Sequence, residues 1–189
     1  MVSYGDMRES EQRRRSFLSG VGAAGITRVL AETAGPTEGA VWSESVLGAN
    51  EGLHLLHFRD QCNIFIKFGS ATGSNNFAMG TQQVMRSTGI PIHRHLQMEE
   101  AFYVLEGAGT VMLEDVPRKF ARGGTINIPK NTWHGFQNPD HELVLLWVVC
   151  PAGLDGFFRE TCTPPGAPPK QLTREQIKAI AKKYATEFR

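Results

Sequence analysis

Short apolar segments alternate with turn residues along the chain from about Leu53 onward. Segments of this kind are typical of strands, and we expect strands at residues 54–58, 62–68, 77–86, 92–95, 100–106, 110–114, 118–120, 125–128, 135–137 and 143–150. Many short strands at close spacing predict an antiparallel sandwich or barrel. The last segment is an unbroken apolar run, which predicts a strand buried on both faces, with Cys150 as a small core residue at its end.

The pattern changes after Pro151. Residues 164–169 are rich in proline and predict a stiff linker. Thr173 then fits a helix N-cap, with Gln176 at the partner position of a capping box. Apolar residues follow at three- and four-residue spacing from Ile177 to Phe188, which predicts a C-terminal amphipathic helix. Its apolar face must be covered by the chain's own barrel or by a second subunit, and we expect a homodimer.

The first 35 residues support two hypotheses. Residues 13–18 contain paired arginines followed by Phe-Leu, and residues 19–26 are small and weakly apolar, as in a twin-arginine export signal. Arg28 interrupts the apolar stretch, and no A-x-A cleavage site follows. The alternative is a basic arm with a helix packed on the barrel. The protein is exported by the twin-arginine route under the first hypothesis and cytoplasmic under the second.

Composition narrows the class of protein without naming a function. Its 189 residues are enough for one good core, and we divide them into the N-terminal arm or signal (1–35), a connecting segment (36–52), a barrel (53–151) and a C-terminal helical extension (152–189). The net charge of +1 gives no argument for a nucleic-acid partner. The sequence contains no run of 18 apolar residues, so it predicts no integral membrane segment.

Cysteine usage argues against a thiolate zinc site. Cys62, Cys150 and Cys162 are widely spaced and form no C-x-x-C pair. One disulfide and three free thiols both fit this spacing.

Two histidines two residues apart supply the candidate chemistry. His93 and His95 lie on one predicted strand, so their side chains point to the same face. An isolated H-x-H pair is more often an ordinary polar pair. Here Glu100 follows five residues later and His134 lies in a second patterned stretch. Together the four predict a site for one divalent transition metal, with Fe, Mn, Ni, Cu and Zn all open.

The order of these residues resembles the two motifs of the cupin family. The first stretch runs from Gly89 through the two histidines and Glu100 to Gly107, and the second runs from Gly123 through Pro129, Asn131 and His134 to Asn138. The resemblance implies an all-β fold, an antiparallel double-sheet jelly roll with one barrel, followed by a short helix near residues 156–160. The family usually has Gly where this chain has Asn131, and Asn is the next most tolerant residue for a left-handed turn.

Residues near the ligands on the same strands predict a substrate pocket. Phe102 follows Glu100 by two residues and Phe136 follows His134 by two, so both should share the inner face. Trp147 and Gln83 are further candidates whose strand parity the sequence leaves open. Asn138 and Gln97 are candidate partners for the metal-binding imidazoles.

Three functions fit such a site. The first is a metal-dependent oxygenase resembling the small quercetin-dioxygenase-like cupins, acting on a small organic substrate. The second is a metal-assisted isomerase or lyase acting on a sugar acid or keto acid, because stabilising an enolate needs only a Lewis acid. The third is a non-enzymatic cupin that binds a small ligand or a metal. No separate catalytic acid or base stands out in the sequence.

Overall fold

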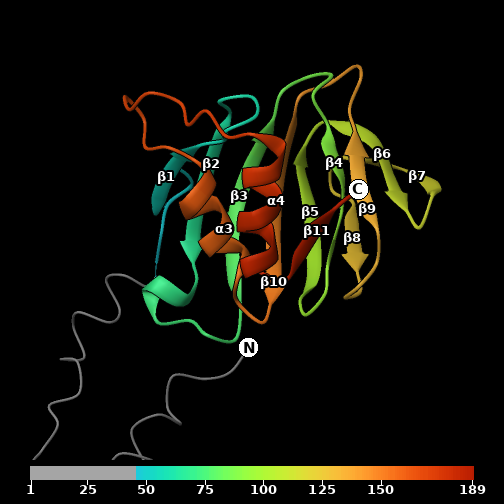
Figure 1. The fold of residues 1–189 in the computed structure, drawn as a ribbon. Coiled ribbons are helices and arrows are strands. Elements are labelled where there is room, and N and C mark those ends of the chain that lie inside the picture. The colour runs from blue at the N-terminus through green and yellow to red at the C-terminus, as the bar shows by residue number, and fades with distance from the viewer. Residues whose placement is uncertain (1–45) are drawn as a thin grey trace, which may run out of the picture. The chain divides into compact units, whose positions relative to one another are not determined.

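The computed structural model describes residues 46–189, which form two facing antiparallel sheets (Figure 1). The predicted export signal or basic arm lies outside the described residues. The larger sheet contains, in spatial order, β1 (Leu53–Leu56), β2 (Asn63–Phe68), β3 (Ala78–Val84), β10 (Leu143–Cys150), β5 (Glu99–Glu106) and β8 (Thr125–Ile128). The smaller contains β11 (Thr186–Phe188), β4 (Ile90–His95), β9 (His134–Gln137), β6 (Ala108–Leu113) and β7 (Val116–Ala121). The predicted all-β double-sheet class is confirmed.

Alternating burial on the central strands defines the core between the sheets. On β10, Leu143, Leu145, Trp147 and Val149 are fully buried. The intervening residues of β10 are half-buried, and Cys150 is exposed. The prediction of a strand buried on both faces was therefore wrong for the outer face, and Cys150 is not a core residue. All three cysteines are free thiols.

Two short helices cover the inner face of the larger sheet near β3 and β10 (Figure 1). The first, α3 (Leu154–Thr161), is the predicted helix after the barrel, and its Phe158 ring lies 5.5 Å from the ring of Trp147. The second, α4 (Arg174–Lys183), begins at the predicted Thr173–Gln176 capping box. Ile177 and Ile180 pack against the core, so α4 covers its apolar face with its own barrel.

The predicted C-terminal helix is too long, because α4 ends at Lys183 and β11 follows. The chain turns at Ala185, whose φ is +49°, and then pairs with β4. This pairing satisfies main-chain groups along the edge of β4, which a continued helix would leave open. Glu187 also pairs with Arg94, at 2.6 Å between Oε2 and Nη2. The helical spacing of Tyr184 and Phe188 was therefore misleading.

Left-handed backbone at two motif positions fixes the turns around β4. Gly89 has φ +67°, and a Cβ atom there would clash with the carbonyl oxygen of Phe136. Asn131 has φ +65°, which confirms the conformation predicted where the family usually has Gly. The main-chain nitrogen of Asn131 donates to the carbonyl of His95 at 2.6 Å. Both turns therefore hold the motif strands in register.

Lys67 ties the segment before β1 to the barrel. Its ammonium donates to the carbonyl oxygens of Gly48, Ala49 and Glu51, and the side chain is buried. Among the described residues, no helix is long and apolar enough to cross a membrane.

Candidate metal centre

Three strands bring the predicted ligands together between the two sheets. His93 and His95 lie on β4, His134 lies directly opposite His93 on β9, and Glu100 lies on β5 of the facing sheet. One donor atom from each of the four lies within 4.8 Å of every other. All four side chains are buried, with exposures of 8%, 2%, 3% and 0% for His93, His95, Glu100 and His134. We call these four residues the ligand cluster.

Each imidazole of the ligand cluster is held through its Nδ1 atom. His93 Nδ1 lies 2.8 Å from the carbonyl oxygen of Pro91, and His134 Nδ1 lies 2.9 Å from that of Thr132. A carbonyl oxygen only accepts, so Nδ1 carries the proton in both rings. The Nε2 atoms are then left to bind a metal.

Thr186 on β11 fixes the third imidazole in the same way. Its hydroxyl lies 2.8 Å from His95 Nδ1 and donates to the carbonyl of Tyr184 at 3.1 Å. Since its proton is used there, the hydroxyl accepts from His95 Nδ1–H. The sequence suggested Asn138 and Gln97 for this role, and Asn138 has a different one. It bridges the turns around β9, accepting from Gly89 N at 2.9 Å and donating to the His141 carbonyl at 2.7 Å.

Glu100 is ionised at the centre of the ligand cluster. Burial alone would raise the pKa of its carboxyl, but the close imidazoles of His95 and His134 hold that pKa well below its ordinary value. Its Oε2 lies 3.2 Å from Nε2 of both His95 and His134. Burial, with His134 and His95 close by, also lowers the pKa of His93 well below its ordinary value, so this ring is neutral at neutral pH.

The ligand cluster fits a divalent transition metal. The buried His95 Nε2 has no hydrogen-bond partner, since its 3.2 Å contact with Glu100 lies outside hydrogen-bond geometry. An unpartnered ring nitrogen, converging on two others and a carboxylate, is the donor set that such an ion binds. Any proton shared between Glu100 and the imidazoles must leave when the metal binds. The mixed donors select no single metal.

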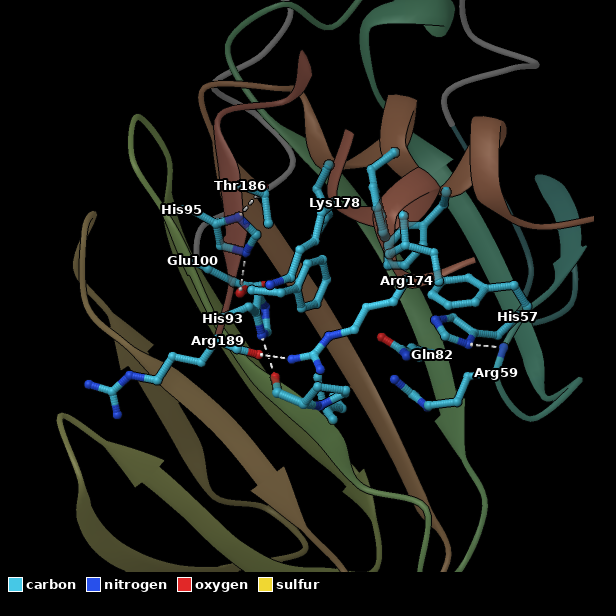
Figure 2. Close-up of a pocket in the computed structure, with 18 of the residues that line it drawn as sticks. His57, Arg59, Gln82, His93, His95, Glu100, Arg174, Lys178, Thr186 and Arg189 are labelled. Atoms are coloured by element: carbon cyan, nitrogen blue, oxygen red, sulfur yellow. Dashed lines mark hydrogen bonds and ion pairs between the residues drawn. The ribbon is translucent and has the colours of Figure 1, made fainter. Parts of the chain in front are cut away.

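A cavity of about 290 Å³ opens beside the ligand cluster (Figure 2). His93, His95 and Glu100 lie on its wall. Most of the remaining wall is apolar, and α3, α4 and β11 supply part of it. It includes Leu154, Phe157, Phe158, Ile177 and Phe188. The ring of Phe188 stacks on His93 with centroids 5.5 Å apart. The helical extension and β11 therefore close over the candidate centre.

The predicted pocket residues take different places. Phe102 lines the cavity, and Phe136 packs edge-on behind it at 4.9 Å between ring centroids. Trp147 is fully buried beneath the cavity wall. Gln83 points away: its amide contacts Glu142 and Asn63. Its neighbour Gln82, 5% exposed, lines the cavity instead. On β3 it is therefore Gln82, and not Gln83, whose side chain faces the cavity.

Several residues at this site could not be recognised from the sequence. His57 and Arg59, from the turn between β1 and β2, line the cavity, as do Arg174 and Lys178 of α4 (Figure 2). No motif contains them, and their elements meet the ligand cluster only in the folded chain. Thr186 was missed because β11 was taken for helix.

A model of the cupin domain matches residues 80–150, which contain all four residues of the ligand cluster. The chain has a cupin domain. The matched residues run from β3 to the end of β10, so this cupin domain carries the ligand cluster, while β1, β2, α3, α4 and β11 flank it.

Known relatives resemble only part of the chain. An uncharacterised protein of Methanocaldococcus jannaschii is 32% identical over 69 residues, which are 33% of this chain and 55% of the relative. Protein SchB of Streptomyces halstedii is 36% identical over 69 residues, 36% of this chain and 50% of SchB. The chain thus spans about half the length of these curated relatives. An RmlC-like cupin from Shewanella frigidimarina superposes with a TM-score of 0.50 at 17% identity, covering 58% of this chain and 93% of that one, and shares the fold.

Proposed function

We propose that this protein is a metal-dependent enzyme that oxidises a small organic substrate with dioxygen, the ligand cluster holding the metal. The proposal is supported by three Nδ1-anchored imidazoles and an ionised carboxylate beside a cavity with largely apolar walls. When bound, a redox-active divalent metal would supply electrons to dioxygen and a binding position for a substrate oxygen.

The residues around the cavity favour oxidation over proton-transfer chemistry. Among the described residues, Glu100 is the only acidic side chain on the cavity wall, and it belongs to the ligand cluster. The remaining imidazole, His57, accepts at Nδ1 from the main-chain nitrogen of Arg59 at 3.1 Å. Its proton therefore lies on Nε2, and this neutral ring is a donor rather than a base. Lys178 is exposed to water. An isomerase or lyase needs a placed base, which this wall lacks.

The chain's own residues would bind and orient the substrate and exclude water. Phe102, Phe157 and Phe158 offer aromatic surface to a planar molecule, and β11 with its Phe188 covers the ligand cluster. A cavity of about 290 Å³ lies at the small end of the range for small-molecule sites. A homodimer stays a prediction beside this proposal.

Metal content and oxygen consumption test the proposal. The purified protein should retain about one divalent ion per chain by elemental analysis, in line with one four-donor site. Loaded with iron(II) or manganese(II), it should consume oxygen with members of a panel of flavonols and diketones, giving oxygenated products by mass spectrometry. No oxygen uptake across the panel, together with turnover of keto acids by the zinc-loaded protein, would favour the isomerase or lyase instead. Ligand binding without any product would favour a binding protein.

Variants of two histidines provide a matched comparison. His134→Ala removes a fully buried residue of the ligand cluster and should abolish metal retention while far-ultraviolet circular dichroism shows the fold intact. His141→Ala removes an exposed imidazole outside the ligand cluster and should retain the metal. Unchanged metal stoichiometry in His134→Ala would show that the metal is bound elsewhere.

A further inference from the structure

The guanidinium of Arg59 lies on the cavity wall without a hydrogen-bond acceptor. Its Nε and Nη2 atoms are buried and unpartnered, and the side chain is only 18% exposed. Asp60 forms an ion pair with Arg59, but the 3.7 Å from its Oδ2 to Nη2 is too long for a hydrogen bond, so the donors of the guanidinium stay unfilled. Buried donors without acceptors are unfavourable, so the unfilled Nε and Nη2 atoms are candidates for binding an anion.

Two neutral donors accompany Arg59 on the same wall. His57 carries its proton on Nε2, as its Nδ1 accepts from the main chain, and its ring is 3% exposed. The contact between His57 Nδ1 and Asp60 Oδ1 at 3.5 Å is no ion pair, because burial and the neighbouring Arg59 lower the pKa of His57. Gln82, from β3, also lines the cavity, and Figure 2 shows its carboxamide next to Arg59. A guanidinium with amide and imidazole donors can surround one small anion.

Apart from Glu100 of the ligand cluster, the charged side chains that line the cavity are basic. Arg59, Arg174 and Lys178 line it, and Glu100 is the only acidic residue to do so among the described residues. The two cations of α4 are exposed, so water screens them, and Arg174 already donates to the Arg189 carbonyl at 3.1 Å. The Arg189 guanidinium itself points away to Asp115. Arg59 is therefore the most buried of these three cations, and its unfilled donors are the ones that a bound anion would satisfy.

We infer that the cavity binds a small carboxylate, held at its acid group by Arg59 with His57 and Gln82, with the rest of the molecule directed toward the ligand cluster. A planar carboxylate matches the planar guanidinium, and the aromatic walls suit a compact organic body better than a hydrated phosphate. This inference names the substrate class of the proposed function and rests on it for the orientation of the ligand.

Paired probes test the inference in the full chain loaded with zinc, which does not react with dioxygen. Calorimetry should show 4-hydroxybenzoate binding at least about 10-fold more tightly than 4-hydroxybenzamide, the range that a charge-assisted hydrogen bond supplies. Arg59→Gln should remove this preference while zinc stoichiometry is unchanged. Arg59→Lys, which keeps the charge but loses the planar fork, should retain part of it. Arg118→Gln, on exposed β7, should behave as the wild type.

Several results would overturn the inference. Equal binding of acid and amide by the wild type would do so, as would no binding of either at millimolar concentration. A preference that persists in Arg59→Gln would show that the metal, not Arg59, holds the carboxylate. Tighter binding of phenyl phosphate than of 4-hydroxybenzoate would make the site a phosphate site. Should Arg59→Gln not fold, the wild-type comparison and Arg59→Lys decide. A wild type that retains no zinc would contradict the proposed function instead, and the probe preference can then be measured without metal.

Discussion

Replacing Thr186 by Val removes the acceptor that orients His95 while preserving the shape of the side chain. Thr186 is 2% exposed, and its hydroxyl links His95 Nδ1 to the carbonyl of Tyr184. The variant leaves a buried N–H without a partner, which costs about 1–3 kcal/mol. Since 1.4 kcal/mol corresponds to a factor of ten, zinc affinity should fall about 5- to 150-fold. This range contains the roughly 10- to 100-fold typical of partners that orient metal ligands.

The assay is a competition titration against a fluorescent zinc chelator. Thr186→Ser keeps the hydroxyl and should bind zinc nearly as tightly as the wild type, while Thr186→Val should not. Thermal unfolding of the metal-free forms, run in parallel, separates lost metal affinity from lost fold stability. Equal affinity of the Val and Ser variants would refute the reasoning, because the hydroxyl would then have no part in orienting His95.

Three further predictions concern other parts of the barrel. Burial and, to a smaller extent, Arg59 lower the pKa of His57, so protonation of this ring favours the unfolded chain. The stability of the metal-free protein should therefore fall as the pH drops below about 6.5. Urea titrations across this range should show a smaller fall in His57→Gln. A pH dependence identical in the variant would contradict the assignment. Asn131→Val should destabilise by about 1–2 kcal/mol in urea unfolding, because φ is +65° there, whereas Asn131→Gly should be tolerated; equal stability of the two would argue against the left-handed turn. Lys67→Met removes the ammonium that binds the carbonyl oxygens of Gly48, Ala49 and Glu51. Limited proteolysis should therefore cut the 48–51 segment faster in the variant than in the wild type. An unchanged cutting rate would show that other contacts hold this segment.

The motif residues could be predicted because their spacing carries local geometry. Alternation placed His93 and His95 on one face, and the turn at Asn131 follows from one residue's backbone tolerance. The capping box at Thr173 is likewise local. These features need only a few neighbouring residues, so the sequence alone specifies them.

The remaining parts of the site depend on contacts between distant segments. Thr186 reaches His95 across 91 positions, and no local pattern distinguishes its short strand from the end of a helix. Arg59 lies in a turn far from both motifs, and its role appears only when the cavity closes around it. Gln82 and Gln83 differ by one position, so the face that each presents depended on a strand register that the sequence left open.

The pairing of β11 with β4 also bears on the order of events during folding. The contact from Thr186 to His95 closes a loop of 91 positions, so it belongs to the long-range contacts that form late. Until β11 docks, His95 lacks the acceptor that fixes its tautomer, and Phe188 does not cover His93. An ion that enters before docking therefore meets a looser and more open centre than one that enters afterwards. We therefore expect metal affinity to depend on the docked last strand, and a chain without β11 should bind the ion more weakly while the barrel stays folded.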